Sequence, residues 1–413
     1  MFTSLKTRQV FTFIVTWLSY ASTYLLRKPL GVIKPDLEKT LHLKKSEMGW
    51  LDASLLFPYA VMQMLLGGLG DKIGARKALT ICLIGSAFSM ISFGYWKRFL
   101  VLVILLFLNG TFQAVAWPNC VKALSSWYSD EHRASIFGLW GTCIFAGGIM
   151  GTSLTVYLQF IYSPELEKVF LVPSLIVFVT GLLVFLTLKT PSELNIEIPG
   201  KSQETETNVG EDAELLSVFD VCRLESVPEL LVTVICIKLV RYCLYMWLPM
   251  YLHEALKYSK AQAGMLSTTF EIGGVLGSAF IGVFINRILN GREMLGCFYV
   301  VFLSAISLSL FLITSTWGLV YNLIFTLVTG MLNCGPTSIL TGSIPARIGQ
   351  KVHAQATVSG VVNGFGGAGA IVEGPLIGLI VDYYGWSGAF YLMVLLSILA
   401  SLSLLKGSQD VNT

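Results

Sequence analysis

Residues 67–77 read GGLGDKIGARK, a glycine-rich stretch in which Asp71 stands among the cations Lys72, Arg76 and Lys77. The glycines allow a tight turn and a close approach of helices, and the aspartate and the neighbouring cations can form a charge network. A network of this kind closes one side of a protein and must break when that side opens. We therefore predict a gating loop with Asp71, Arg76 and Lys77 as gating residues. The alternative is an ordinary cationic turn.

A degraded copy of this stretch occurs in the second half of the chain, where residues 282–292 read GVFINRILNGR. Asn286 stands where the first copy has Asp71, and Arg287 follows it as a further candidate gating residue. The repeat favours two related halves. The missing carboxylate predicts gate chemistry that differs between them.

The composition places the chain in a lipid bilayer. Of its 413 residues, 54% are hydrophobic and only 13% are charged, which leaves too little polar surface for a water-soluble fold of this size. The net charge of +3 is scattered and forms no basic block interleaved with aromatic residues, so nucleic-acid binding is not expected. The eight cysteines form no CxxC pair, which argues against a disulfide framework and a zinc site. No cofactor is expected.

Windows of about 20 residues predict twelve transmembrane helices. We therefore expect an all-α membrane protein with two six-helix bundles, at residues 1–189 and 228–406, and a cytoplasmic tail at 407–413. The segment between them, 190–227, is acidic and contains Pro199 and Gly200, so we predict a flexible cytoplasmic linker. The expected spans are 9–31, 48–69, 78–95, 99–121, 135–158, 165–188, 228–252, 263–288, 294–313, 317–342, 354–381 and 386–406.

The distribution of cations predicts the orientation of these helices. If both termini and the linker are cytoplasmic, the larger share of the loop Lys and Arg residues lies on the cytoplasmic side, as membrane proteins prefer. The first hydrophobic run is as long as a retained membrane helix rather than a cleavable signal.

Four basic residues are expected at membrane depth, away from the ends of the spans, and they point to an anionic ligand. Arg27 and Lys28 are adjacent in the first span, and Lys238 and Arg241 lie one helical turn apart in the first span of the second half. A charged side chain at bilayer depth costs roughly 2.5–3.5 kcal/mol, so such residues need a compensating role. Basic residues in corresponding positions of two halves favour one pocket supplied by both, which is typical of transporters.

Several motifs in one order along the chain resemble those of the major facilitator superfamily, and within it the organophosphate:phosphate antiporters, most closely the eukaryotic sugar-phosphate exchangers. The gating loop at 67–77 resembles the signature loop of the superfamily. The other motifs that carry the resemblance are Ser19-Tyr20 through Arg27-Lys28-Pro29, Leu51-Asp52-Ala53 with Tyr59-Ala60-Val61, Asn109 through Gln113 with Trp117-Pro118, Lys238-Leu239-Val240 with Trp247 through Tyr251, and Gly273 through Gly277.

The resemblance implies a secondary antiporter that exchanges a phosphorylated sugar or glycerol phosphate for inorganic phosphate by alternating access. It also implies that arginines in helices 1 and 7, here Arg27 and Arg241, clamp the phosphate, with Tyr20 and Tyr24 nearby. A guanidinium binds phosphate oxygens bidentately, which a lysine cannot reproduce. The other candidate substrate-binding residues are Lys28, Lys238, Tyr242, Tyr245, Gln63, Gln113 and Trp117. The implied location is the endoplasmic reticulum or another endomembrane, with the plasma membrane as the alternative, and a monomer suffices.

This chain departs from the family pattern at three positions. Gln63 stands where the bacterial glycerol-phosphate carrier has a lysine, and Cys143, Ile144 and Phe145 fill a stretch where several relatives have a histidine. Arg241 resembles the bacterial members, because the closest eukaryotic relatives often lack an arginine there. The identity of the organic phosphate therefore stays open.

Each candidate residue also has a plainer interpretation. Lys28 and Lys238 could extend to the interface or neutralise an acid such as Glu271, and the tyrosines could be core residues. Glu271, a candidate gating residue, could instead carry a proton, and Glu373 is a second intramembrane acid. The alternative functions are a proton-coupled carrier of another organic anion and a non-transporting receptor or scaffold. No GxSxG, Walker or HExxH motif occurs, so an enzyme or an ATP-driven pump is not expected.

Overall fold

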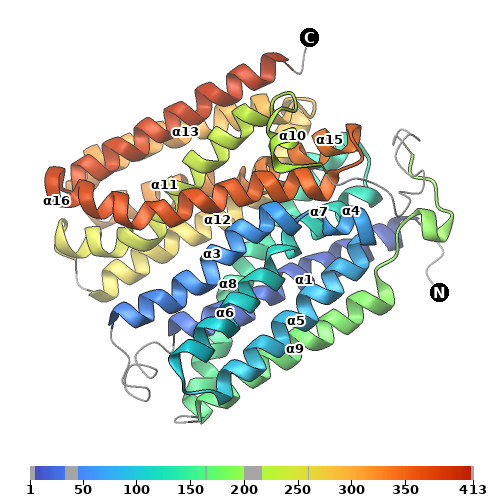
Figure 1. Ribbon diagram of the computed structural model, residues 1–413. Helices are drawn as coiled ribbons and strands as arrows, with labels where there is room; N and C mark the ends of the chain where they lie inside the picture. Colours follow the sequence, from blue (N-terminus) through green and yellow to red (C-terminus); the bar gives the residue numbers. More distant parts are fainter. Residues whose placement is uncertain (1–4, 33–44, 163–164, 200–215, 259, 411–413) are drawn as a thin grey trace. The chain divides into compact units, whose positions relative to one another are not determined.

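The computed structural model describes residues 5–32, 45–162, 165–199, 216–258 and 260–410, and these ranges are almost entirely helical and contain no strand (Figure 1). Within them, nine helices are long and apolar enough to cross a membrane. The prediction of an all-α, multi-pass membrane protein is confirmed. The count of twelve transmembrane helices stays a prediction.

Helix α1 (Leu5–Val32) is not among those nine, and its buried polar residues explain why. Thr16, Ser19 and Thr23 are almost fully buried. Their hydroxyls donate to carbonyls of the same helix, at Thr12 (2.8 Å), Val15 (2.6 Å) and Tyr20 (2.7 Å). Bonds of this kind satisfy the hydroxyls without water, so a polar stripe is tolerated inside the bundle. A helix with such a stripe is less apolar than one that is surrounded by lipid.

The chain divides into two compact units. The first unit comprises residues 1–130, 143–218 and 346–364, and the second comprises 131–142, 219–345 and 365–413. Each unit therefore includes a short segment from the other half of the sequence. The predicted bundle boundaries at 189 and 228 stay predictions, and residues 200–215 of the expected linker lie outside the described residues.

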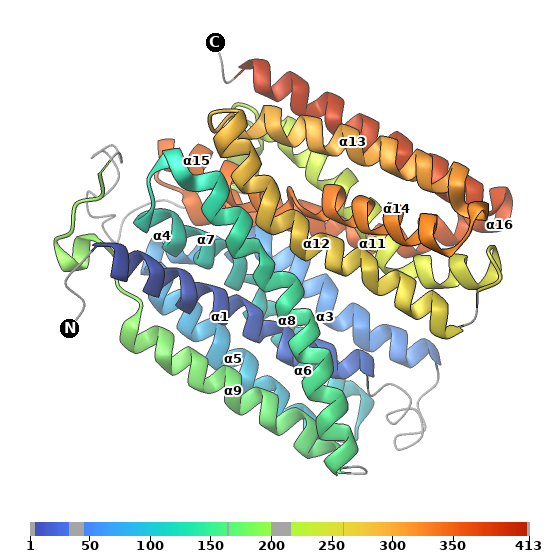
Figure 2. The same cartoon turned by 180° about the vertical axis from the view of Figure 1, so that it is seen from behind.

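The helices of the first unit run through most of the N-terminal half. In both views α1 and α5 lie beside α9, and α3 packs on α6 (Figures 1 and 2). Their bounds are α3 (Lys45–Leu66), α4 (Leu69–Ile73), α5 (Ala75–Tyr95), α6 (Phe99–Ala114), α7 (Ala116–Trp127), α8 (Arg133–Tyr162, assigned to this unit from Cys143), α9 (Leu166–Thr187) and the 3-10 turn η2 (Ser192–Leu194). The unit also includes most of α15 (Ile344–Lys351) and the start of α16 (Gln355–Asp410).

The helices of the second unit run through most of the C-terminal half, and α12 packs along α14. After the 3-10 turn η1 (Asp130–His132) and the start of α8, they are α10 (Val218–Cys222), α11 (Val227–Glu254), α12 (Lys260–Ile288), α13 (Glu293–Thr314), the 3-10 turn η4 (Ser315–Trp317), α14 (Leu319–Cys334) and the π-helical turn η5 (Ile339–Ser343). The remainder of α16 completes the unit.

Four expected spans differ from the observed helices. The span at 99–121 is divided at Val115 into α6 and α7, and Pro118 lies in the first turn of α7. The span at 317–342 is divided into α14 and η5, with Pro336 between them. Proline lacks the N–H that continues a helix, so it is accommodated near a helix start. The spans at 354–381 and 386–406 lie in the single element α16, which is broken at Gly385 (φ 68°).

Two glycines of α8 allow it to pack tightly against α1. A Cβ atom placed on Gly147 would lie 2.7 Å from the Ala21 carbonyl oxygen, and one on Gly151 would lie 2.7 Å from the Tyr24 carbonyl oxygen. Real Cβ contacts are not this short, so only glycine fits at these two positions. Gly147 and Gly151 therefore mark a close contact between α8 and α1. This contact supports the part of α1 that carries the first basic pair.

Candidate functional site

The first candidate site lies on one face of α1. Tyr20, Tyr24 and Arg27 are spaced four and three residues apart, which places them on the same side of a helix. The rings of Tyr20 and Tyr24 meet edge to face with centroids 5.9 Å apart. The guanidinium carbon of Arg27 lies 5.2 Å from the centroid of the Tyr24 ring. The predicted grouping of these three residues is confirmed.

Tyr59 of α3 completes the aromatic surroundings of Arg27. Its ring centroid lies 4.3 Å from the Arg27 guanidinium carbon, closer than that of Tyr24. The hydroxyls of Tyr59 and Tyr20 are 3.3 Å apart and form a hydrogen bond. A desolvated cation over an aromatic ring gains up to about 2 kcal/mol, so two such contacts stabilise the buried charge without neutralising it.

A chain of amide side chains reaches Arg27 from α6. Arg27 Nε donates to Gln113 Oε1, and Gln113 Nε2 donates to Asn109 Oδ1 at 2.7 Å. Asn109 Nδ2 in turn donates to Ser89 Oγ (2.9 Å) and to the Ser86 carbonyl oxygen (3.1 Å), both on α5. Gln113 and Asn109 are both fully buried. We call Tyr20, Tyr24, Arg27, Tyr59, Asn109 and Gln113 the Arg27 cluster.

The Arg27 cluster retains an unsatisfied positive charge. Arg27 Nη2 is buried and has no hydrogen-bond partner among the described residues. Within the same residues, no carboxylate forms an ion pair with Arg27. A buried donor without a partner costs about 1–3 kcal/mol, and more when the group is charged. The cluster is therefore suited to an anion that supplies the missing acceptors.

Three other candidate residues of the first unit lie near α1 or on α3. Trp117 is fully buried, and its ring meets the Tyr20 ring edge to face at 4.9 Å. The side chain of Lys28 extends along α8, where a Cβ atom on Gly148 would lie 3.4 Å from Lys28 Cε. Gln63 is fully buried on α3, and its Oε1 accepts a hydrogen bond of 2.9 Å from Asn363 Nδ2. Gln63 thus pairs with α16.

The candidate residues of the second unit lie on α11 and α12. Lys238, Arg241 and Tyr245 follow one another at spacings of three and four residues, so they share a face of α11. Lys238 and Arg241 are half-buried and Tyr245 is exposed. The Lys238 stem crosses α16, because a Cβ atom on Gly366 would lie 2.6 Å from Lys238 Cδ. The remaining two, Tyr242 on α11 and Glu271 on α12, are half-buried.

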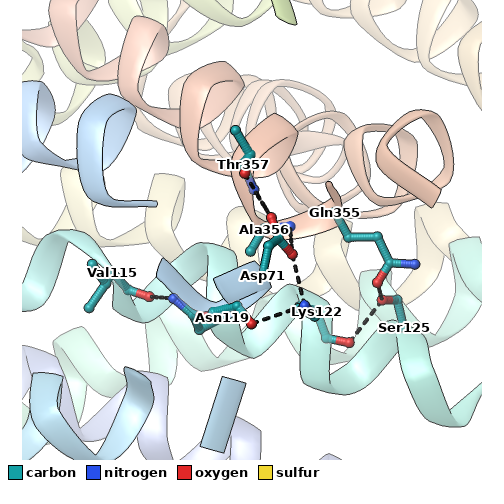
Figure 3. Close-up of polar contacts among 9 residues, drawn as sticks. Asp71, Val115, Asn119, Lys122, Ser125, Gln355, Ala356 and Thr357 are labelled. Atoms are coloured by element: carbon teal, nitrogen blue, oxygen red, sulfur yellow. Dashed lines mark hydrogen bonds and ion pairs between the residues drawn. The ribbon is translucent and has the colours of Figure 1, made fainter. Parts of the chain in front are cut away.

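The predicted gating loop forms a compact polar network around Asp71 (Figure 3). Asp71 is 7% exposed, and its Oδ1 forms an ion pair of 2.9 Å with Lys122 Nζ of α7. The backbone amide of Ala356 donates to the same oxygen at 3.2 Å. The amide and the hydroxyl of Thr357 donate to Asp71 Oδ2 at 2.7 and 2.8 Å. We call Asp71, Lys122, Ala356 and Thr357 the Asp71 latch.

The Asp71 latch joins a carboxylate to the start of a helix. Ala356 and Thr357 lie in the first turn of α16, where amide N–H groups have no partner within the helix and carry partial positive charge. A second contact lies beside it, where Ser125 Oγ donates to Gln355 Oε1 at 3.2 Å. Gly70 leaves no room for a side chain, because a Cβ atom there would overlap Asn119 Oδ1. The crowded turn at Gly70 and the N–H groups of the first turn of α16 together fix the position of the Asp71 side chain.

The other predicted gating residues do not contact Asp71. Arg76 forms an ion pair of 3.1 Å with Glu193, and both side chains are partly exposed. Lys77 and Arg287 are exposed. The charge network was expected to use the cations that flank Asp71, but the cation paired with Asp71 is Lys122, 51 residues later. Arg76 and Lys77 lie in the next helix, α5.

Asn286 replaces this chemistry in the second copy of the motif. Its Nδ2 donates to the Glu131 carbonyl oxygen at 2.9 Å, just before the start of α8. Its Oδ1 is buried and has no partner among the described residues. Asp71 therefore accepts hydrogen bonds from a helix start, whereas Asn286 donates to a carbonyl. The two copies thus differ in hydrogen-bond role, and a difference in gate chemistry stays a prediction.

Sequence reasoning missed four side chains of the Arg27 cluster and the Asp71 latch, which are Tyr59, Asn109, Lys122 and Thr357, and the backbone amide of Ala356. Tyr59 and Asn109 lie within motifs that carry the resemblance, so their positions held a signal. Lys122 is the one charged residue of α7, and the cost of burying its charge could have indicated an acidic partner. Thr357 had no signal, because its contribution depends on where α16 starts.

Comparisons with known proteins agree with this architecture. The family model "Major Facilitator Superfamily" matches residues 12–372 and 230–410. The mouse (Mus musculus) protein "Sugar phosphate exchanger 3" is 28% identical over 471 residues, which cover 96% of this chain and 92% of the relative. The bovine (Bos taurus) protein "Glucose-6-phosphate exchanger SLC37A2" is 25% identical over 465 residues, which cover 96% and 93%.

A solved structure shows the same fold. The crystal structure of the Major Facilitator Superfamily transporter FucP in the outward conformation has a TM-score of 0.73 to this chain at 14% sequence identity, and the alignment covers 97% of this chain and 99% of FucP. At that identity the likeness concerns the fold alone. Since the family model spans most of the sequence and the helices follow the same fold, this chain belongs to the Major Facilitator Superfamily of membrane transporters.

Proposed function

We propose that this protein is an antiporter that exchanges a phosphorylated sugar or glycerol phosphate for inorganic phosphate by alternating access. The observation that carries the proposal is the buried guanidinium of Arg27, which has aromatic and amide contacts and an unpartnered Nη2. Two oxygens of a phosphoryl group match the planar donors of a guanidinium. The full-length similarity to proteins named as sugar phosphate exchangers supports the same substrate class.

The mechanism follows from the buried charge. Arg241 is the second arm of the proposed phosphate clamp, and Lys28 and Lys238 add positive charge near each arginine. Closing an empty pocket around the buried Arg27 guanidinium removes its remaining water without supplying an anion, which is costly. A bound phosphoryl group supplies that anion and allows the carrier to change conformation. Exchange of one phosphate compound for another is the expected result.

The Asp71 latch is the proposed gate of this cycle. Its hydrogen bonds hold the start of α16 against the turn that follows α3, and they break when the protein changes conformation. Arg76, Lys77, Arg287 and Glu271 are further proposed gating residues. We also propose cytoplasmic termini, function as a monomer, and a location in the endoplasmic reticulum or another endomembrane, with the plasma membrane as the alternative.

Counterflow in proteoliposomes tests the proposal. Vesicles that contain the purified protein are loaded with inorganic phosphate, and uptake of labelled glucose 6-phosphate or glycerol 3-phosphate is followed. Arg27→Ala and Arg241→Ala are expected to abolish uptake, whereas Thr111→Ala is expected to leave it unchanged. Thr111 is a suitable control because its hydroxyl is exposed and, among the described residues, donates only to the Phe107 carbonyl oxygen of its own helix. Unchanged uptake in both arginine variants would remove the clamp.

Glu373 favours a second candidate function, a proton-coupled carrier of an organic anion. It is 4% exposed on α16, and its Oε1 has no hydrogen-bond partner among the described residues. Buried carboxyls in membrane carriers take up and release protons. This function predicts uptake that is driven by a pH gradient without internal phosphate and lost in Glu373→Gln or Glu271→Gln. Dependence on internal phosphate instead supports the exchanger.

A further inference from the structure

Gln113 is a candidate substrate contact by sequence, but its side chain is already engaged inside the protein. Its Oε1 accepts from Arg27 Nε, and its Nε2 donates to Asn109 Oδ1 at 2.7 Å. The side chain has no solvent exposure. Gln113 thus contacts the arginine with one end of its amide and a buried asparagine with the other.

The second end of this chain is anchored on α5. Asn109 is fully buried, and its Nδ2 donates to both Ser89 Oγ and the Ser86 carbonyl oxygen. The anchor fixes the Asn109 amide, because only its nitrogen can donate to these two oxygens and its oxygen must then face Gln113. The Gln113 amide is oriented in turn, with its oxygen toward Arg27. Three helices therefore determine the rotation of one guanidinium.

This arrangement limits how an anion can approach Arg27. A guanidinium binds a two-oxygen anion either along the Nε and Nη edge or end-on through both Nη atoms. Gln113 occupies Nε, and the rings of Tyr24 and Tyr59 contact the guanidinium at 5.2 and 4.3 Å. The donor left without a partner among the described residues is the terminal Nη2.

We propose that Gln113 and Asn109 are positioning residues that fix the Arg27 guanidinium so that it presents its terminal Nη2 to a phosphoryl group. The inference rests on the proposed function and goes beyond it, because it reassigns Gln113 from substrate contact to arginine support. Asn109 belongs to the same chain of hydrogen bonds, but it bonds to Gln113 rather than to Arg27 and does not contact the ligand itself. The effect of either residue on phosphate binding must therefore pass through Arg27.

A double-mutant cycle tests this dependence. The KM for external inorganic phosphate is measured in phosphate-loaded proteoliposomes for wild type, Gln113→Ala, Arg27→Lys and the double variant. Loss of one hydrogen bond to a charged group predicts a rise in KM of about tenfold for Gln113→Ala, with a smaller change in the maximal rate. In the Arg27→Lys background the same substitution is expected to change KM less than about twofold, because lysine has no Nε for Gln113 to hold. Thr111→Ala is the control.

A second cycle provides the test if Arg27→Lys shows no uptake. Asn109→Ala is expected to raise the phosphate KM in the wild-type background and to add nothing in the Gln113→Ala background, since the chain is already broken. The inference would be overturned if Gln113→Ala raised the phosphate KM equally with and without Arg27→Lys. It would also be overturned if the effects of Gln113→Ala and Asn109→Ala on KM were additive. Either result would leave the proposed exchange function standing. Wild-type protein without phosphate-dependent uptake would overturn the proposed function, and the inference with it.

Discussion

The amide nitrogen of Thr357 lies 2.7 Å from Asp71 Oδ2, so the first turn of α16 is capped by a carboxylate that precedes it by 286 residues. Charge-assisted hydrogen bonds of this kind are about twice as strong as neutral ones. The carboxylate accepts three bonds from two residues of α16 and also pairs with Lys122. A single side chain therefore joins α7 and α16 to the turn between α3 and α5.

Asp71→Asn is expected to slow exchange and to lower thermal stability. The amide keeps the size of the side chain, but it loses the charge and turns one acceptor into a donor that faces backbone N–H groups. We expect a fall of about 10- to 100-fold in the counterflow rate, which corresponds to about 1.4–2.8 kcal/mol. Lys72→Gln is the matched control, because Lys72 is the exposed neighbour of Asp71. An Asp71→Asn protein with wild-type rate and melting temperature would show that the latch has no role.

Arg27→Lys is expected to impair exchange almost as strongly as Arg27→Ala. Lysine keeps the charge but lacks the planar fork of donors, because its three N–H groups diverge from one nitrogen and cannot present parallel donors to two phosphate oxygens. We expect the phosphate KM to rise by at least about tenfold, as for the loss of a strong hydrogen bond. The measurement is the concentration dependence of counterflow. If lysine restores wild-type KM, positive charge alone suffices and the guanidinium geometry does not matter.

The sequence predicted the helical class, the membrane location and the grouping of Tyr20, Tyr24 and Arg27, because each depends on local composition or helical spacing. It could not predict Lys122 as the partner of Asp71. That contact forms because α7 places Lys122, 51 residues after Asp71, beside the turn, whereas Arg76 and Lys77 are closer to Asp71 in the sequence. Proximity along the chain was a poor guide, because the next helix directs Arg76 toward Glu193.

Tyr59 and Gln63 show the same limit within one helix. Both lie on α3 in a region that the resemblance covers, and Gln63 was the residue expected in the pocket. The structure gives Tyr59 the contact with Arg27 and pairs Gln63 with Asn363. Four residues separate the two positions, so they lie about one helical turn apart along the axis. Which turn of α3 reaches Arg27 depends on how α3 packs against α1, and a helical period does not contain that information.

Gly151→Ala is expected to destabilise the protein although it adds only one methyl group. The new Cβ atom would lie 2.7 Å from the Tyr24 carbonyl oxygen, and relief of this clash requires α8 and α1 to separate. Overpacking of a tight contact typically costs about 1–3 kcal/mol. The thermal midpoint in detergent measures the loss, and phosphate exchange should fall with it because Tyr24 and Arg27 lie on the displaced helix.

Gly148→Ala provides the comparison for this prediction. A Cβ atom at Gly148 would lie 3.4 Å from Lys28 Cε, which is an ordinary contact with a flexible side chain. The same chemical change, three residues away on the same helix, is expected to be close to neutral. Similar losses in the two variants would mean that glycine is needed in α8 for a reason other than its contact with α1.

Asn286→Asp tests whether the second copy of the gating motif needs its amide. Asn286 Nδ2 donates to the Glu131 carbonyl oxygen at 2.9 Å, so a carboxylate would place two acceptors at hydrogen-bond distance. The Glu131 carbonyl would lose its donor and face a negative charge, and because this contact is exposed the predicted loss in stability is about 1 kcal/mol. The change restores the aspartate of the first copy, yet it is expected to weaken the protein.

Asn290→Asp is the control for this last substitution. Asn290 is exposed in the following loop with a φ of 50°, a conformation that aspartate tolerates about as well as asparagine. Thermal unfolding of both variants separates the effect of the added charge from that of the lost donor. If Asn286→Asp instead raises the melting temperature, a donor near the site bonds to the new carboxylate. The second copy would then accept hydrogen bonds, as Asp71 does in the first copy. If Asn286→Asp loses stability and Asn290→Asp does not, the protein needs the amide donor of Asn286 itself. The two copies of the motif then act through opposite hydrogen-bond roles.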